Sequence, residues 1–339
     1  MKAIFEVETL QICTTNACVL ECANCTHLVG HAKRPYMMTL DEFKRIVDSL
    51  EGYPRMIGLI GGDPCISPFF AEQSRYLGSK FPREQLGLWT TFPKGEKYYK
   101  LRDVICETYG NILLNDHSVS TIMHAPMLVA AGEYYDDIKD LHAAAWNCWV
   151  QNAWSPGITP KGAFFCEVAG ELDYLFDGPG GWDVSEPGWW KKTPKDYKEQ
   201  IEFACAKCGG CLPLGRRSSQ DNRDDISEGN YELLKGKSSK VDSGKVVVHR
   251  KGEFKIEQGM IDPATGVSRY PDQSPYKDEQ YRKGIAARYG IGLRLNRRGY
   301  WDPYLMSDAE RNRQPPASLY QILNAKYAPQ EKSSEPVVS

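Results

Sequence analysis

The chain has 339 residues, of which 25% are charged and 41% belong to the apolar set, as in an ordinary globular protein with one large domain or one domain and an appendage. Its formal net charge of −2 predicts no basic surface for nucleic acid or an anionic membrane. No apolar run approaches the ~20 residues that span a bilayer. The opening MKAIFEVETLQIC alternates in polarity and carries acids, unlike a signal peptide. We therefore expect a cytoplasmic protein.

The first half of the chain predicts strands that alternate with helices. Residues 10–15 predict a short strand, and Thr39 with Glu42 forms a capping box at the start of an amphipathic helix. Further strands are predicted at 55–64, 85–91, 111–116 and 146–154, and further helices at 67–81, 95–109 and 132–145. Alternating strands and helices favour a parallel sheet with right-handed crossovers. Five or six such units favour an open partial barrel over a closed eight-fold one.

The alternation of strands and helices ends near residue 158. ITPKGAFFC predicts a turn and a strand that lead into a helix, and a Gly, Pro and Trp-rich loop follows at 178–190. The segments RRSSQDNRDD (216–225) and KGKSSKVDSGK (235–245) are polar and charged, which predicts mobile linkers. Residues 246–256 could form a hairpin, and we expect the last residues, 330–339, to be disordered.

Eleven cysteines are present, and in a reducing compartment they favour metal binding or catalysis over disulfides. Two groups are tightly spaced. The first consists of Cys18, Cys22 and Cys25, and the second of Cys205, Cys208 and Cys211. The others are single: Cys13, Cys65, Cys106, Cys148 and Cys166.

The first group places three thiolates on one loop, and thiolates are the soft ligands that zinc and iron–sulfur clusters require. A structural zinc ion needs four ligands, and His27 could be the fourth. The alternative is a [4Fe–4S] cluster with three cysteine ligands and one iron left open for another molecule. Three cysteines instead of four would then mark a reactive position.

The stretch CVLECANC (18–25) resembles the CxxxCxxC signature of radical SAM enzymes. The resemblance implies a [4Fe–4S] cluster whose open iron binds the amino and carboxylate groups of S-adenosylmethionine, and an electron that cleaves this cofactor to a 5′-deoxyadenosyl radical. The loop follows the first predicted strand, where barrel enzymes place their active sites. GGDP (61–64), at the end of the second strand, is similar to the family's GGEP-type turn. The resemblance implies that Gly61, Gly62, Asp63 and Pro64 bind the methionyl part of the cofactor.

Three other residues are candidate cofactor contacts. Asn24 stands where the family often has an aromatic residue, and the adenine contact there is partly through the backbone. Asn115, with Asp116, follows the fourth predicted strand and could reach the ribose, although both could instead cap or turn the chain. Gln151, near the end of the fifth predicted strand, has the same two interpretations.

Cys166 with Cys205, Cys208 and Cys211 offers four thiolates, which could hold zinc. Their context is similar to the twitch and SPASM modules of radical SAM proteins, which implies one auxiliary [4Fe–4S] cluster and two clusters in all. The expected fold is α/β, a partial (β/α)6 TIM-type barrel with a small auxiliary-cluster module. We expect the barrel over 1–157, the module over 158–215, a C-terminal extension over 216–307 and a flexible tail over 308–339.

The resemblance implies removal of a hydrogen atom from a small-molecule or glycan substrate, with electrons from a reductase such as flavodoxin or ferredoxin. We favour a carbinol carbon of a carbohydrate or glycoside, which is epimerised or oxidised to a ketone. Cys148 and Cys65 could donate a hydrogen atom in epimerisation or could be packing residues. Glu167 and Glu171 could accept protons or be structural. Two alternatives stay open: modification of a peptide or protein side chain, and a non-catalytic zinc-binding interaction protein.

Overall fold

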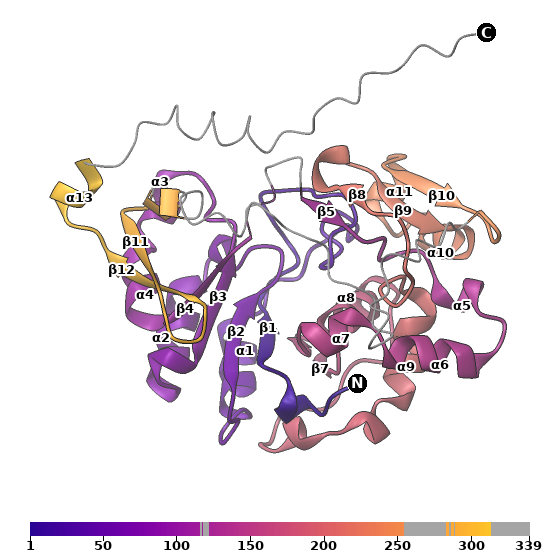
Figure 1. The fold of residues 1–339 in the computed structure, drawn as a ribbon, viewed down its shortest axis with the longest axis horizontal. Coiled ribbons are helices and arrows are strands. Elements are labelled where there is room, and N and C mark those ends of the chain that lie inside the picture. Colours follow the sequence, from indigo (N-terminus) through magenta and orange to yellow (C-terminus); the bar gives the residue numbers. More distant parts are fainter. Residues whose placement is uncertain (116, 118–121, 254–282, 285, 288, 313–339) are drawn as a thin grey trace, which may run out of the picture.

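The computed structural model describes residues 1–115, 117, 122–253, 283–284, 286–287 and 289–312. It is a mixed α/β structure built on an open eight-stranded sheet (Figure 1). The strands lie in the order β11-β12-β4-β3-β2-β1-β6-β7. Their bounds are Thr9–Cys13 for β1, Met56–Ile60 for β2, Leu86–Thr90 for β3, Asn111–Leu114 for β4, Gly157–Thr159 for β6, Gly162–Phe164 for β7, Ile291–Leu295 for β11 and Trp301–Leu305 for β12.

Strands β1 to β4 are parallel and follow one another across the sheet, as the alternating pattern predicted. Every residue of β1, β2 and β3 is buried, which is typical of parallel strands covered on both faces. Strand β6 pairs in parallel with the other side of β1. The remaining pairs are antiparallel: β7 with β6, β12 with β4, and β11 with β12. The described strands form no closed sheet, so the structure confirms the α/β class and leaves the barrel unconfirmed.

Helices α1 (Leu40–Asp48), α2 (Phe70–Lys80), α3 (Glu96–Tyr99) and α4 (Arg102–Thr108) follow the first strands. The capping box of α1 is confirmed, because Thr39 and Glu42 each accept a hydrogen bond from the other's backbone N–H. The remaining helices are α5 (Ala131–Tyr134), α6 (Ile138–Trp146), α7 (Trp149–Ala153), α8 (Glu167–Leu175), α9 (Lys198–Ala204), α10 (Glu228–Leu234), α11 (Ser239–Asp242) and α13 (Asp308–Asn312). No helix among the described residues is long and apolar enough to cross a membrane.

The predicted strand at 146–154 is wrong, because this segment ends α6 and then forms the short helix α7. A short apolar run has the same composition in a buried helix as in a buried strand, so its sequence does not distinguish them. Tertiary contacts favour the helix. The N-terminal ammonium donates to Trp146 O, and the Gln151 amide exchanges two hydrogen bonds with the backbone of Lys2.

The two segments predicted as mobile linkers are ordered. Residues 216–225 contain β8 (Arg217–Ser218) and the start of β9 (Asp224–Ser227), and 235–245 contains α11. β8 pairs with β5 (Met123–His124), and β9 pairs in parallel with β10 (Val246–His249), the first half of the segment in which a hairpin was expected. Charged side chains are ordered here because they are buried in pairs, which composition alone does not reveal. Residues 254–256 and the predicted disordered end lie outside the described residues.

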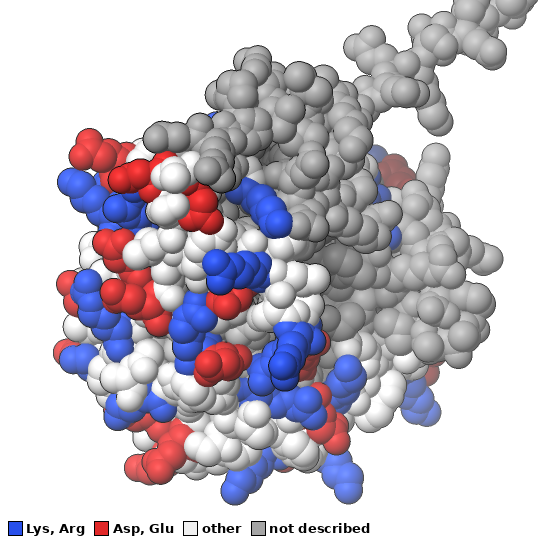
Figure 2. Space-filling view, turned by 60° about the vertical axis from the view of Figure 1, so that its left-hand side comes forward, with Lys and Arg blue, Asp and Glu red and all other residues white. Residues whose placement is uncertain are grey.

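The chain is arranged in two groups of elements on either side of β1 (Figure 1). Strands β2 to β4 and the β11–β12 hairpin lie on one side, and helices α5 to α9 with β9 and β10 lie on the other. The first of these two sides carries basic and acidic side chains that are interspersed (Figure 2).

Candidate functional site

The cysteine loop follows β1 and leads to α1. Cys18, Cys22 and Cys25 line one pocket, which encloses about 70 Å³ of space and opens partly to solvent. Its other lining residues are Leu20, Thr26, His27, Val29, Ile60, Gly61, Gly62, Thr91, Asn115, His117, His124, Ala125, Met127, Trp149 and Trp154.

The glycine turn after β2, Gly61 and Gly62, packs against the backbone at the start of the cysteine loop. A Cβ atom at Gly61 would lie 2.1 Å from Thr15 O, and one at Gly62 would lie 2.0 Å from Ala17 O. The backbone N–H of Gly62 donates to Thr15 O, and that of Asp63 donates to Ala17 O. Only glycine permits this approach of two backbones. Gly61 and Gly62 therefore both line the pocket and fix the loop.

Asp63 and Pro64 do not line the pocket. The buried Asp63 carboxylate accepts hydrogen bonds from the backbone N–H groups of Cys65 and Thr91 and from the hydroxyl groups of Thr90 and Thr91. Burial nevertheless raises the pKa of this carboxyl group above its usual value. In the described residues Asp63 ties the glycine turn to the end of β3, so any contact with a cofactor would come from the glycines.

Asn24 has φ = +50° and lies buried against the C-terminal part of the chain. Its side-chain amide donates to Asp225 Oδ2 and accepts from the Asp225 backbone N–H, at 2.8 Å in both cases. Its own backbone N–H donates to Asp224 Oδ1. Asparagine tolerates the left-handed region better than a bulky residue does, so the backbone conformation at this position suits Asn24. It does not line the pocket.

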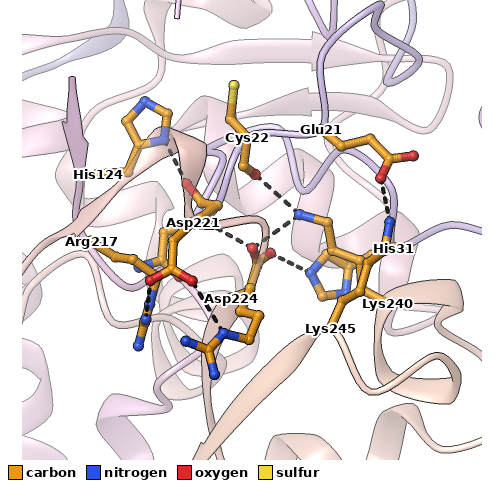
Figure 3. Close-up of polar contacts among 12 residues, drawn as sticks. Glu21, Cys22, His31, His124, Arg217, Asp221, Asp224, Lys240 and Lys245 are labelled. Atoms are coloured by element: carbon orange, nitrogen blue, oxygen red, sulfur yellow. Dashed lines mark hydrogen bonds and ion pairs between the residues drawn. The ribbon is translucent and has the colours of Figure 1, made fainter. Parts of the chain in front are cut away.

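A buried ion-pair network fastens the cysteine loop to β9 and α11 (Figure 3). The Lys240 ammonium donates to Cys22 O at 3.1 Å and to Asp224 Oδ1 at 3.0 Å, and His31 Nε2 lies 2.6 Å from Asp224 Oδ2. Lys240 and Asp224 are each only 1% exposed. Burial would raise the pKa of Asp224, but His31 and Lys240 hold it below its usual value. The predicted linkers therefore form the support of the candidate site.

Four aromatic side chains that the cysteine motif does not indicate line the pocket: His117, His124, Trp149 and Trp154. Burial lowers the pKa of both imidazoles, which makes them neutral near pH 7. His124 Nδ1 donates to Ala23 O at 2.7 Å, so its tautomer is set by the cysteine loop. A single histidine with no motif around it does not indicate from the sequence that it lines a pocket.

Asn115 lines the pocket at the end of β4, where its backbone N–H donates to Thr90 O. Its predicted partner Asp116 lies outside the described residues. Gln151 does not line this pocket, because α7 directs it to the backbone of Lys2. Of the three additional cofactor candidates, only Asn115 lies at the pocket wall.

A second, small cavity is lined by five cysteines: Cys148, Cys166, Cys205, Cys208 and Cys211. Four of these are the predicted second ligand set. Cys148, which immediately precedes α7, is the fifth residue in this lining. This position does not fit its predicted role as a hydrogen donor at the first pocket. Burial raises the pKa of Cys148 to about 11 and that of Cys208 to about 12. Thiols in such surroundings stay protonated unless a metal binds them.

Cys65, the other predicted hydrogen donor, is also absent from the pocket wall. It is 3% exposed, and its Sγ lies 3.4 Å from Thr90 Oγ1. Cys65 therefore packs in the hydrophobic core, next to the glycine turn.

A single zinc ion requires its ligand atoms to lie at a particular spacing. Tetrahedral zinc with Zn–S bonds of about 2.3 Å needs sulfur atoms about 3.8 Å apart. Among the described residues, neither cysteine set contains three sulfur atoms within 4.8 Å of one another, and His27 joins no such group with Cys18, Cys22 or Cys25. The described side chains of neither set are therefore arranged around a single zinc ion.

No family model matches the sequence, and no curated protein does. Two solved structures show a weak likeness, each at 14% sequence identity. One is BtrN in complex with AdoMet and 2-DOIA, with a TM-score of 0.34 over 48% of this chain and 73% of that chain. The other is SeMet BtrN in an open conformation, with a TM-score of 0.38 over 60% and 87%. Scores this low do not establish a common fold, so the site is interpreted from its own residues.

Proposed function

We propose that this protein is a radical SAM enzyme that uses a [4Fe–4S] cluster on Cys18, Cys22 and Cys25 together with S-adenosylmethionine. The observation that supports it most is that the three thiols of the cysteine motif and the Gly61–Gly62 turn line one pocket. When bound, the cluster and S-adenosylmethionine supply a 5′-deoxyadenosyl radical, which removes a hydrogen atom from the substrate.

The chain's own residues position the bound molecules. Gly61 and Gly62 offer a wall without side chains for the methionyl part, and Asn115 offers an amide to the ribose. The neutral imidazoles of His117 and His124 can exchange hydrogen bonds with hydroxyl groups. Trp149 presents an aromatic surface to C–H groups.

These walls favour an uncharged polyhydroxy substrate, such as a carbohydrate or glycoside that reacts at a carbinol carbon. Epimerisation would need a hydrogen donor near that carbon, and the thiols that line the pocket in the described structure are those of the cluster loop. We therefore favour oxidation to a ketone. After the hydrogen atom has gone to the radical, the substrate would lose its hydroxyl proton and one further electron.

The second cysteine cavity is the proposed destination of that electron. Cys166, Cys205, Cys208 and Cys211 would hold an auxiliary [4Fe–4S] cluster there, with Cys148 as a fifth thiol on the same wall. A reductase such as flavodoxin or ferredoxin would supply the first electron.

Anaerobic reconstitution tests the proposal. Wild type should bind roughly eight irons and eight sulfides per chain and cleave S-adenosylmethionine when reduced. Cys22→Ala should lose about half of the iron and all cleavage, whereas Cys208→Ala should lose about half of the iron and keep cleavage. Cys106→Ala, on α4 and at neither cavity, is the matched control and should change neither. If the reconstituted protein contained stoichiometric zinc and no iron, the proposed radical SAM activity would be refuted.

A separate measurement distinguishes oxidation from epimerisation. Oxidation should give a carbonyl product and incorporate no solvent deuterium at the reacting carbon, whereas epimerisation should place one deuterium there. A labelled alcohol product would contradict the preference for oxidation and leave the radical SAM assignment intact.

A further inference from the structure

A third group of metal-binding side chains lies apart from both cysteine sets. It consists of Cys13 at the end of β1, His27 in the cysteine loop and Glu171 on α8. One donor atom of each lies within 4.8 Å of the other two. All three are buried, with exposed fractions of 0%, 5% and 1%.

Several atoms around this group lack hydrogen-bond partners. His27 Nε2 and Glu171 Oε2 are buried and make no hydrogen bond in the described structure, and the buried Oε1 of Glu167 lies 3.9 Å from His27 Nε2, at ion-pair distance. A buried polar atom without a hydrogen bond costs about 1–3 kcal/mol, and a ligand that contacts these atoms would remove that cost.

The paired atoms of the same residues hold the unpaired ones in place. Tyr36 OH donates to Glu171 Oε1 at 2.6 Å, and His27 Nδ1 lies 3.3 Å from that same oxygen. Ser155 Oγ donates to Glu167 Oε2 at 2.8 Å. The carboxylates of Glu171 and Glu167 are thus each held through one oxygen atom, as metal-binding carboxylates with outer hydrogen bonds are.

We propose that Cys13, His27 and Glu171 bind one divalent transition-metal ion of the zinc class. A thiolate, an imidazole and a carboxylate are a typical zinc donor set, and the thiolate disfavours magnesium and calcium. The charges of the Cys13 thiolate and the Glu171 carboxylate balance those of the ion. Tetrahedral zinc needs four donor atoms about 3.3–3.8 Å apart, so side-chain shifts of about 1 Å would close the site, with a water molecule as the fourth ligand.

The ion would join three elements that are distant in sequence. β1 contributes Cys13, the cysteine loop contributes His27 and α8 contributes Glu171. His27 also lines the first pocket, so the ion would fix one wall of that pocket. This role does not depend on the proposed radical chemistry.

The test is metal analysis of the full-length, anaerobically reconstituted protein after dialysis against a weak chelator. Wild type should retain one zinc per chain in addition to any iron. Cys13→Ala and the nearly isosteric Glu171→Gln should lose at least 90% of it, while Cys106→Ala and the exposed-site variant Glu51→Gln should keep it. With cobalt in place of zinc, a thiolate-to-cobalt absorption band should appear that depends on Cys13.

Three results would overturn the proposal: wild type without zinc or cobalt, a cobalt band that survives in Cys13→Ala, or a band that disappears only when Cys18, Cys22 and Cys25 are replaced. Because Glu171→Gln preserves the shape of the side chain, it tests the site even where Cys13→Ala does not fold. Missing iron with zinc retained would reject the radical SAM function alone.

Discussion

Lys240 and Lys245 both pair with acids at the cysteine loop, yet their surroundings differ completely (Figure 3). Lys240 is buried between Asp224 and the carbonyl of Cys22, whereas Lys245 and its partner Glu21 are exposed by 39% and 55%. Removing one member of a buried pair leaves the charge of the other poorly compensated in a buried site, but an exposed pair is already solvated.

Lys240→Met should therefore lower the free energy of unfolding by about 3–5 kcal/mol, and Lys245→Met by less than about 1 kcal/mol. Thermal unfolding of the two variants measures this difference. We also expect Lys240→Met to retain less iron after reconstitution, because Lys240 holds the backbone of Cys22. Equal effects of the two substitutions would show that the network does not support the loop.

Gly62 differs from other glycines in what surrounds it. Gly62→Ala should displace the cysteine loop, since the added methyl group would lie 2.0 Å from Ala17 O, and should abolish stable iron binding. Gly78→Ala is the matched control in helix α2, where the nearest atom is 3.4 Å away, and it should be neutral or slightly stabilising. Iron content and circular dichroism of both variants distinguish loss of the loop from global unfolding.

At the scale of elements, β9 is the part of the chain that holds the cysteine loop. Asp225 on β9 accepts from the amide of Asn24 and forms a two-pronged pair with Arg217 of β8. His249 Nε2 of β10 lies 2.8 Å from the same carboxylate. Burial opposes ionisation, but these three partners outweigh it and lower the pKa of Asp225 below its usual value.

This pairing predicts a dependence of stability on pH. The folded-state pKa of Asp225 lies below the unfolded value of about 3.9, so its contribution is complete above that pH and is lost as the pH falls toward the folded pKa. Asp225→Asn should lower the melting temperature at pH 7 and reduce the further loss below pH 4. Asp221→Asn is the control, because Asp221 pairs with the same Arg217 and is more exposed. An identical acid profile in wild type and Asp225→Asn would contradict the assignment.

At the scale of the whole molecule, segments far apart in sequence complete one sheet and one site. The β11–β12 hairpin pairs with β4, and Arg83 forms a 2.6 Å ion pair with Asp302 of that hairpin. The two cysteine cavities lie in the same chain but share no lining residue among the described ones. Ligands at the two cavities should therefore be separable by mutation.

S-adenosylmethionine should raise the melting temperature of cluster-loaded wild type by a few degrees, because saturation at 100 Kd stabilises the folded state by about 2.7 kcal/mol. Cys208→Ala should keep this shift and Cys22→Ala should lose it. Anaerobic thermal scans with and without the cofactor measure both. A shift that survives in Cys22→Ala would place the cofactor elsewhere.

Local signals in the sequence determined the parallel strands, the capping box of α1 and the spacing of the cysteines. These features depend on residues a few positions apart, so they can be recognised without long-range information. The same holds for the pairing of Gly61 and Gly62 with the cysteine loop, since each follows a predicted parallel strand and neighbouring strands end at the same edge.

Only the tertiary structure decided what Asn24, Lys240, Cys148 and Gln151 contact. Asn24 and Lys240 meet Asp224 from positions about 200 residues apart in the chain. Cys148 and Gln151 both lie away from the first pocket, because residues 149–153 form a helix although their composition also suits a strand. Burial of a charged pair and the choice between two compact local structures both depend on distant neighbours, and the sequence pattern around a residue carries no record of them.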